Sequence, residues 1–524
     1  MLGTLLTVAH NSHASSIDIT DRIDRGSSGG ASMVLYTRPP RLSVSRETFF
    51  GRQTPVVIPV FKEGDSIKLP EGLPQDLESL LKESYNSKAV SPEPGSVAKL
   101  PYRGGLVVTA GCGAPGDLEG VRRGFAAASR QVVDSFEEAQ LYLVGLDTVS
   151  STEAVIGALL GAYRLEEFKN TRKRKLQQLW VYGGEPRLDY AQAVAEGVYL
   201  ARDIANAPPH RLPPAKLAAA VEDLFSKFDN VDVEVFSYDR LLEEGFGGIV
   251  SVGMGSEEKP RLIIIKYRGG AGEPIALVGK AVVFDSGGIN LKPSQGMTLM
   301  RADKAGGAAV VGAMWTAARL GIKASIIGLI PAVINVPSGS SYLPSDVIRM
   351  WDGTMVEITN TDAEGRLILA DAISYAAKQL GAKTVIDLAT LTGAIVVALG
   401  PLIAGLFTRS DGLARAFEEA SRTTGEKIWR MPMEDEYAKS LTQPAQAGEI
   451  VNAAQRYGGA IFGALFLERF VHGKEFAHLD IAGPGIAFEA GSLAPPYWPE
   501  KGMAPGYGVR LLIEVLSRMA RGGG

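Results

Sequence analysis

A concentration of charged residues in apolar surroundings constrains the fold of this chain more than any other feature. A group of four carboxylates, two lysines and one arginine stands out among the charged residues of 280–366, namely Lys280, Asp285, Lys292, Asp303, Asp362, Glu364 and Arg366. Carboxylates that gather among strand-like and helix-like apolar residues repel one another and lose hydration unless cations neutralise them. Because four carboxylates balance the charge of two divalent metal ions, the sequence predicts a two-metal hydrolytic site.

Asp362 and Glu364 lie two residues apart, just before an apolar stretch that begins at Leu367 and is typical of a helix. In an extended chain both side chains point to one side, together with Asn360 and Arg366. The pair is therefore predicted at a strand-to-helix junction, which is where ligands bind at the edge of open α/β sheets. A solvated turn with a helix-capping acid is the alternative that this pattern leaves open.

The other charged segment begins inside the apolar run 275–284, which contains Lys280 and is followed by Asp285. A regular pleat places residues five apart on opposite faces, so the strand must bend or bulge if both side chains serve one site. As a metal ligand Lys280 would have to be neutral, and lowering its pKa from about 10.4 to below 7 costs roughly 4–5 kcal/mol, which two adjacent dications could supply. A buried ion pair between Lys280 and Asp285 is the alternative. Lys292 is expected to stay charged and to polarise a substrate carbonyl.

Composition limits the kinds of protein and of metal site that the chain can form. A length of 524 residues exceeds one ordinary core, and 46% hydrophobic with 21% charged residues is typical of a soluble globular protein with two or more domains. The formal net charge of −4 argues against a dedicated nucleic-acid binder and leaves a local basic patch open. One cysteine, Cys112, fits a reducing cytoplasm and, with only five histidines, excludes thiolate zinc sites and an HExxH arrangement. Any metal must therefore be held mainly by oxygen atoms.

Neither a signal peptide nor a membrane partner is expected, and the protein is predicted in the cytoplasm. The N-terminus lacks a basic leader followed by a long apolar core. Residues 388–407 contain no charged residue over a length that could span a bilayer, but they include two threonines, three glycines and a proline. A buried strand, a tight turn and a further apolar segment are predicted there instead.

Strand-like and helix-like stretches alternate along the chain, which predicts an α/β protein with two domains. In the second half, four apolar runs fit strands buried on both faces, at residues 262–267, 275–284, 326–333 and 384–388. Helical stretches between them predict a mostly parallel central sheet flanked by helices. A helix over 187–207 is predicted to connect a smaller N-terminal α/β domain, residues 1–186, to a larger catalytic domain, residues 208–524.

Three further motifs have simpler structural interpretations. Residues 111–116 fit the GxGxxG pattern of dinucleotide-binding loops, but the next suitable acid, Asp147, lies about thirty residues on rather than about twenty, so a tight turn is predicted. Residues 26–30 match GxSxG without a preceding strand and are expected to form a loop. His478 could act as a base or a ligand, although a single histidine beside an apolar run is more often a core or interface residue.

Taken together, the charged segments resemble the leucyl aminopeptidase family, whose members are two-metal cytosolic exopeptidases. Residues 360–367, Asn-Thr-Asp-Ala-Glu-Gly-Arg-Leu, match the family's signature octapeptide. Other motifs match at the family spacing, namely Val-Gly-Lys at 278–280, Phe-Asp-Ser-Gly-Gly at 284–288, Leu-Lys-Pro at 291–293, Ala-Thr-Leu-Thr-Gly-Ala at 389–394, Gly-Gly-Ala-Ile at 458–461, His-Leu-Asp-Ile-Ala-Gly at 478–483 and Gly-Val-Arg at 508–510. The resemblance covers most of residues 200–515, and the N-terminal part resembles the family's smaller α/β domain only in order and size.

The resemblance implies roles for individual residues. A tightly held metal ion would be bound by Lys280, Asp285, Asp303 and Glu364, and a more exchangeable ion by Asp285, Asp362 and Glu364. Lys292 would polarise the scissile carbonyl, and Arg366 would hold a bicarbonate that serves as general base. The pocket for the N-terminal residue of the substrate would be lined by Met300, Asn360, Ala363, Thr390 and Gly393.

The implied activity is removal of N-terminal residues, Leu and other apolar ones preferred, from peptides by a metal-activated water. A homohexamer is implied as well, with Mn²⁺ or Zn²⁺ as favoured ions, Mg²⁺ or Co²⁺ as alternatives and bicarbonate as a further cofactor. Two departures from the family concern packing, pH optimum and side-chain preference: Lys304 stands where methionine is common, and Ile334 where an acid is usual. Two rival classes stay open, a two-metal phosphoesterase and a DNA-binding hexamer that would need a basic groove.

Overall fold

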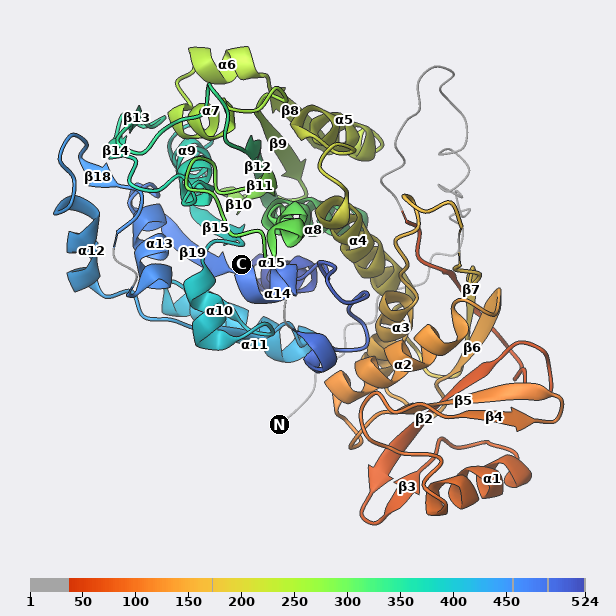
Figure 1. Cartoon of the computed structure of the whole chain (residues 1–524). Coiled ribbons are helices and arrows are strands. Elements are labelled where there is room, and N and C mark those ends of the chain that lie inside the picture. Colours follow the sequence, from red (N-terminus) through yellow and green to blue (C-terminus); the bar gives the residue numbers. More distant parts are fainter. Residues whose placement is uncertain (1–36, 172, 455–456, 488–489, 523–524) are drawn as a thin grey trace, which may run out of the picture. The chain divides into compact units, whose positions relative to one another are not determined.

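The computed structural model describes residues 37–171, 173–454, 457–487 and 490–522. All of them belong to one compact unit, Leu35–Gly524. Strands and helices alternate along it, and the strands form a seven-stranded, a nine-stranded and a three-stranded sheet (Figure 1). The predicted α/β architecture, with a smaller N-terminal and a larger C-terminal part, is confirmed. The GxSxG match at 26–30 lies outside the described residues.

The seven-stranded sheet contains the strands of the N-terminal part, in the order β1-β7-β6-β2-β5-β4, with β3 beside β2. Its strands are β1 (Arg41–Val44), β2 (Val56–Glu63), β3 (Ser66–Lys68), β4 (Lys99–Tyr102), β5 (Gly105–Gly111), β6 (Glu138–Tyr142) and β7 (Gln178–Tyr182). All neighbours from β1 to β5 run parallel, which requires crossover connections. The helices of this part are α1 (Gln75–Asn86), α2 (Leu118–Val132) and α3 (Thr148–Gly161).

Acidic caps fix where two of these helices begin. Asp117 accepts the backbone N–H of Gly120 at the start of α2, and Asp147 accepts that of Ser150 at the start of α3. Residues 111–116 form the connection from β5 to α2, as the tight-turn interpretation predicts. Asp147 is thus engaged in capping α3, a role that needs no bound dinucleotide.

The nine-stranded sheet has the order β17-β16-β19-β15-β10-β12-β9-β8, and β11 also pairs with β12. Its strands are β8 (Val231–Phe236), β9 (Arg261–Arg268), β10 (Ile275–Gly279), β11 (Ala281–Asp285), β12 (Ser325–Asn335), β15 (Thr384–Ala389), β16 (Ala404–Phe407), β17 (Ile428–Arg430) and β19 (Glu475–Asp480). Neighbours from β12 to β19 run parallel, while the β12–β9, β9–β8 and β16–β19 pairs are antiparallel. The four predicted apolar runs become β9, β10 with β11, β12 and β15.

Helices and a small sheet complete the C-terminal part. The helices are α5 (Pro214–Phe225), α6 (Tyr238–Glu243), α7 (Gly247–Gly253), α8 (Ala305–Leu320), α9 (Gly365–Lys378), α10 (Gly393–Leu399), α11 (Asp411–Thr424), α12 (Asp435–Thr442), α13 (Gly459–Glu468), α14 (Ala482–Ile486) and α15 (Val509–Gly522), with 3₁₀-helices η2 (Met297–Ala302) and η3 (Gly491–Leu493). The small sheet consists of β13 (Val347–Arg349), β14 (Met355–Glu357) and β18 (Ile450–Val451). One buried cluster joins the central strands to α9 through side chains such as Val278, Leu329 and Ile373. This apolar layer fixes the strand ends and helix starts that carry the charged residues.

The helix α4 (Leu188–Asn206) lies between the two large sheets in sequence and falls within the predicted segment 187–207. It packs against α3 and α8. The approach to α8 requires a glycine, because a Cβ at Gly197 would lie 2.0 Å from Oγ1 of Thr316. Helix α8 begins two residues after Asp303, so α4 packs on an element that adjoins the charged cluster.

The uncharged stretch 388–407 forms the end of β15, the short helix α10 and β16, as predicted. β16 pairs with β19 inside the nine-stranded sheet. Among the described residues, no helix is long and apolar enough to cross a membrane.

Candidate metal centre

A break in one strand brings Lys280 and Asp285 to the same side of the nine-stranded sheet. β10 and β11 meet at Lys280, and both run parallel to β12. The register against β12 shifts by one residue between Val282 and Phe284, which marks a bulge. Positions 280 and 285 therefore stand opposite residues 331 and 335, four apart, so their side chains share a face. The predicted irregularity is confirmed.

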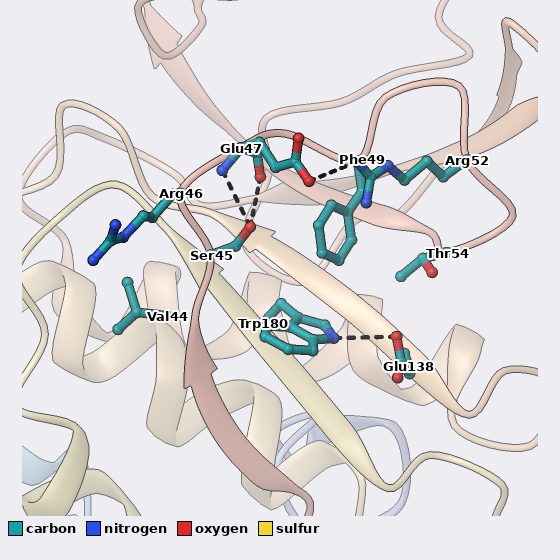
Figure 2. A pocket seen from close by; sticks show the side chains of 9 residues that line it. All are labelled: Val44, Ser45, Arg46, Glu47, Phe49, Arg52, Thr54, Glu138 and Trp180. Atoms are coloured by element: carbon teal, nitrogen blue, oxygen red, sulfur yellow. Dashed lines mark hydrogen bonds and ion pairs between the residues drawn. The ribbon is translucent and has the colours of Figure 1, made fainter.

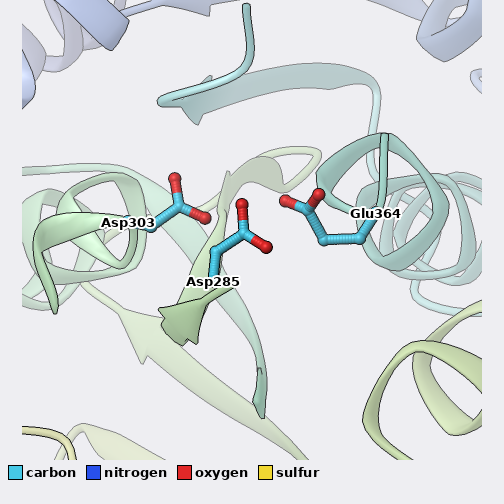
Figure 3. A group of neighbouring side chains, drawn as sticks. All are labelled: Asp285, Asp303 and Glu364. Carbon is cyan, nitrogen blue, oxygen red and sulfur yellow. The ribbon is translucent and has the colours of Figure 1, made fainter. Parts of the chain in front are cut away.

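Three buried carboxylates meet at this face (Figure 3). Asp285 ends β11, Asp303 follows η2, and Glu364 directly precedes α9. Each offers one oxygen atom, and these oxygens all lie within 4.8 Å of one another. Burial raises the pKa of Asp285, and it raises the pKa of Asp303 to about 8. Burial opposes ionisation of Glu364 too, but the nearby lysines outweigh it and lower that pKa.

Lys280 lies between two of these carboxylates. Its Nζ is 3.0 Å from Oδ2 of Asp303 and 2.8 Å from Oε1 of Glu364, and it donates to the carbonyl of Thr390 at 2.9 Å. Gly365 leaves room for the side chain, because a Cβ there would lie 2.8 Å from Nζ. Burial lowers the pKa of Lys280, but Asp303 and Glu364 outweigh burial and raise it overall.

Lys292 joins the fourth carboxylate to the cluster. Its Nζ lies 2.8 Å from Oδ2 of Asp285 and also contacts Oδ1 of Asp362. Burial raises the pKa of Asp362 to about 6. The ion-pair partner of Asp285 is therefore Lys292 rather than Lys280. The four predicted carboxylates and two predicted lysines of the centre lie in one connected group.

The segment that carries Asp362 and Glu364 turns rather than extends, so the prediction of an extended chain is wrong. Residues 361–362 form a turn, and α9 begins at Gly365 instead of Leu367. Oδ1 of Asn360 accepts the backbone N–H of Asp362 at 2.9 Å, and such a local bond favours a turn over extended backbone. A solvated helix-capping acid does not describe Glu364 either, because it is buried and makes no capping hydrogen bond.

Asn452 holds this turn from a distant part of the chain. Its Oδ1 accepts the N–H of Thr359 at 2.8 Å, and its Nδ2 donates to the carbonyl of Asn360 at 2.7 Å. The backbone carbonyl of Asn452 in turn accepts a hydrogen bond from Nη1 of Arg366 at 2.8 Å. Sequence reasoning missed Asn452, because no local pattern pairs it with a residue 92 positions earlier.

Arg366 is buried beside the carboxylates, and burial lowers its pKa to about 10. Its guanidinium carbon lies 5.3 Å from the centre of the Phe462 ring. Among the described residues its Nε has no hydrogen-bond partner. A guanidinium with an unused buried donor suits an anion, because anionic acceptors form its strongest hydrogen bonds.

The residues predicted to line a substrate pocket fall into two groups. The first group is joined to the centre by hydrogen bonds. Oγ1 of Thr390 donates to Oδ1 of Asp303 at 2.7 Å. In the turn that carries Asp362, the N–H of Ala363 donates to the carbonyl of Asn360. Met300 and Gly393 belong to adjoining elements, η2 and the first turn of α10. A Cβ at Gly393 would meet no atom within 4 Å, so this position borders open space.

Lys304, one of the two departures, is fully buried next to Asp303. Its Nζ donates to the carbonyls of Ala207 at 3.1 Å, Val283 at 3.3 Å and Arg301. Burial lowers its pKa to about 7. The amine thereby ties the end of α4 to β11 and η2 rather than facing the carboxylates. The other departure, Ile334, is half-buried near the end of β12.

His478 is a core residue, as its surroundings in the sequence suggest. Its Nδ1 lies 2.7 Å from Oδ1 of Asp387 on the neighbouring strand, and both side chains are fully buried. The ring of Phe407 stacks on the imidazole at 5.7 Å between centres. His478 makes no contact with the carboxylate cluster among the interactions of the described residues.

A shallow pocket in the N-terminal part is chemically different (Figure 2). It is lined by the end of β1, the loop that follows it, β6 and β7. There Arg52 stacks over Phe49, and the indole N–H of Trp180 donates to Glu138. Its charged groups are exposed, Arg52 forms an ion pair with Glu47, and the pocket contains no group of buried carboxylates. The centre around Asp285 is therefore the stronger candidate for catalysis among the described residues.

The donors of the centre fit divalent cations. Carboxylate oxygens are the ligands that Mg²⁺ and Mn²⁺ prefer, and a neutral amine extends the choice to Zn²⁺. Buried carboxylates with raised pKa values gain most from a nearby positive charge. The chemistry of the carboxylates thus suits divalent cations, and that of the nearby Arg366 guanidinium suits an anion.

Comparisons with known proteins agree with this description. A family model described as "Cytosol aminopeptidase family, catalytic domain" matches residues 199–513, and one described as "Cytosol aminopeptidase family, N-terminal domain" matches residues 57–172. A probable cytosol aminopeptidase of Cenarchaeum symbiosum is 41% identical over 405 residues, which is 76% of this chain and 79% of the relative.

Two solved structures are similar over most of the chain. A mutant of tomato leucine aminopeptidase superimposes with a TM-score of 0.80 at 31% identity, covering 94% of this chain and all of the other. The bottromycin maturation enzyme BotP in complex with Mn gives a TM-score of 0.79 at 32% identity, covering 89% of this chain and all of BotP.

Proposed function

The chain belongs to the cytosol aminopeptidase family and is a metal-dependent aminopeptidase, and we propose that it uses two divalent ions to remove apolar N-terminal residues from peptides. The observation that carries this proposal is the meeting of three buried carboxylate oxygens within 4.8 Å, beside two lysines and a fourth carboxylate. One ion would be held by Lys280, Asp285, Asp303 and Glu364, and the other by Asp285, Asp362 and Glu364. When bound, the ions would supply Lewis acidity for the attacking water and the scissile carbonyl, and an anchor for the free α-amino group.

The lysines have different tasks in this proposal. Lys280 must give up its proton to act as a ligand, and it already contacts Asp303 and Glu364, the groups with which it would share an ion. Lys292 keeps its proton and donates a hydrogen bond to the carbonyl oxygen of the scissile bond. Such a donor stabilises the oxyanion that develops as water adds to the carbonyl.

Arg366 would hold a bicarbonate that takes the proton from the attacking water. The unpartnered Nε supports this role, because it leaves a buried donor for an anionic acceptor. The pocket for the N-terminal side chain would be lined by Met300, Asn360, Ala363, Thr390 and Gly393. An apolar side chain such as that of Met300 favours leucine- or methionine-like residues over charged ones.

Further parts of the proposal concern the whole chain. Residues 1–186 would form the N-terminal domain, 187–207 the connecting helix and 208–524 the catalytic domain. The protein would act in the cytoplasm as a homohexamer. Light scattering tests the assembly by asking whether the particle has six times the mass of one chain, and limited proteolysis tests the boundaries by where it cuts.

The decisive experiment measures release of p-nitroaniline from leucine p-nitroanilide. Protein stripped of metal is assayed before and after addition of Mn²⁺ or Zn²⁺, with N-acetylleucine p-nitroanilide as the control for the free amine. Cleavage of the free-amine substrate alone, restored by metal, supports the proposal. Folded protein that cleaves neither substrate with any divalent ion, or that instead hydrolyses p-nitrophenyl phosphate, refutes it. Aspartate and lysine p-nitroanilides test the apolar preference.

A further inference from the structure

We propose that Asn335 is a positioning residue that selects which oxygen of Asp285 faces the metal ions and fixes the distance from β11 to the turn at 361–362. This inference rests on the proposed metal site. Asn335 is the last residue of β12, lies opposite Asp285 in the parallel register, and is fully buried. Its backbone carbonyl accepts hydrogen bonds from both the N–H and the hydroxyl of Ser286, so its own position is well fixed.

The side-chain amide of Asn335 joins the two halves of the centre. Nδ2 donates to Oδ1 of Asp285 at 2.9 Å and to the backbone carbonyl of Thr361 at 3.1 Å. Both partners are acceptors, which fixes the orientation of the amide, since only the NH₂ end can donate. One half of the centre is the strand that ends at Asp285, and the other is the turn that leads to Asp362.

This contact divides the two oxygens of Asp285 between different tasks. Oδ1 also accepts the backbone N–H of Gly287 at 2.8 Å, so two N–H donors occupy it. Oδ2 faces the ammonium of Lys292 at 2.8 Å and is the oxygen left for cations. Two donors on one oxygen restrain the rotation of a carboxylate, so that it presents the other oxygen in one direction.

Part of the Asn335 side chain is unsatisfied. Within the part of the chain that the structure describes, its Oδ1 has no hydrogen-bond partner, and it faces Gly288, where a Cβ would lie 2.8 Å away. A buried acceptor without a partner destabilises a fold. The two N–H bonds to the centre, rather than packing, are therefore what this side chain contributes.

The same geometry makes replacement of Asn335 structurally mild. In Asn335→Leu, Oδ1 of Asp285 keeps the N–H of Gly287, and the carbonyl of Thr361 keeps the hydroxyl of Tyr342 at 2.7 Å. The unsatisfied Oδ1 disappears. The variant should therefore fold, while the Asp285 carboxylate loses one of the two N–H donors that hold its Oδ1 and is less firmly oriented.

The test compares metal affinity with folding stability. The full chain is stripped of metal, and binding of Mn²⁺ or Zn²⁺ is measured by competition with a chromophoric chelator. Asn335→Leu is expected to bind 10- to 100-fold more weakly, the usual effect of removing a group that orients a metal ligand. Its thermal unfolding in excess chelator should stay within a few degrees of the parent. Raised metal concentration should restore part of its aminopeptidase activity, which a purely structural defect would not allow.

Gln140→Leu is the matched control. Gln140 is a fully buried amide in β6 that accepts the N–H of Phe49 and donates to the carbonyl of Glu47, far from the carboxylates in sequence and in a different sheet. It should keep the metal affinity of the parent. Should Asn335→Leu fail to fold, Asn335→Ala, which leaves space for water, is measured instead and must show at least a tenfold loss.

Two results would overturn the inference. One is parental metal affinity, within twofold, in the Asn335 variant; the other is an equal loss in the Gln140 variant. In both cases a parent protein that binds metal and cleaves leucine p-nitroanilide leaves the proposed function intact. A parent protein that binds no divalent metal would overturn the proposed function and this inference together.

Discussion

Replacing Lys280 by methionine should strongly destabilise protein kept in excess chelator. The Lys280 side chain is only 4% exposed, and it contacts Asp303 and Glu364, which are 4% and 2% exposed. Methionine fills a similar volume but leaves both carboxylates buried without their counter-charge. Breaking a buried pair in this way costs about 3–5 kcal/mol, and the lost bond to the Thr390 carbonyl adds about 1 kcal/mol.

The loss should depend on pH in a defined direction. Without Lys280, the folded state holds the protons of Asp303 and Glu364 more tightly than the unfolded state does. The free energy of unfolding of Lys280→Met then falls as pH rises through the interval between the pKa values of these two carboxyls in the unfolded and in the folded state. The deficit of Lys280→Met relative to the parent should therefore be larger at pH 8 than at pH 5.5.

Urea unfolding in chelator, followed by circular dichroism, measures this deficit. Lys383→Met is the matched control, because Lys383 forms a 3.0 Å ion pair with Glu273 in which both side chains are about two-thirds exposed. Solvent screens such a pair, and its removal should hardly change stability. If Lys280→Met loses no more stability than Lys383→Met at pH 8, the Lys280 ammonium does not neutralise the buried carboxylates, and the electrostatic account of the centre is wrong.

Three other substitutions test separate parts of the structure. Glu364→Gln should abolish metal binding and peptidase activity, whereas Glu426→Gln, at a buried glutamate that caps α15, should retain metal binding in chelator competition. Arg366→Met should lower kcat about 100-fold or more with little change in KM, as expected when a general base is lost; a change in KM alone would contradict the bicarbonate role. Burial raises the pKa of Asp203 from 3.8 to about 6, so its folded form prefers the proton and stability falls as pH rises through that interval. The stability of the parent relative to Asp203→Asn should therefore drop by about 2 kcal/mol between pH 4 and pH 6.5, and a flat difference in urea unfolding would exclude this.

Local sequence patterns predicted the elements of the catalytic part because those patterns have local physical causes. Apolar runs such as 275–284 and 326–333 have to be buried on both faces, and they become the strands β10, β11 and β12. Lys280 and Asp285 are five residues apart, and a regular pleat would place their side chains on opposite faces of the sheet. A site that contains both side chains therefore required an irregular strand.

Interactions between distant residues were beyond such patterns. The sequence shows that Asn360 is polar, but not that its side chain accepts the N–H of Asp362. This bond favours a turn over an extended chain because Asn452, far along the sequence, holds the neighbouring backbone. The partners of Asn335 are likewise 50 and 26 positions away. The local sequence around an asparagine does not indicate which acceptors its side chain will contact in the folded chain.

Two of the four carboxylates of the centre, Asp285 and Asp303, have their partners arranged in the same way. Asp285 gives Oδ1 to N–H donors and Oδ2 to Lys292, and Asp303 gives Oδ1 to the hydroxyl of Thr390 and Oδ2 to Lys280. Each side chain is thus held through one oxygen and offers the other to positive charge. One oxygen each of Asp285, Asp303 and Glu364 lie within 4.8 Å of one another, because a strand end, the end of a 3₁₀-helix and the start of α9 meet there. In the proposed site, carboxylates held in this way would not have to reorient to receive a cation, which would keep the ligands of a bound ion well oriented.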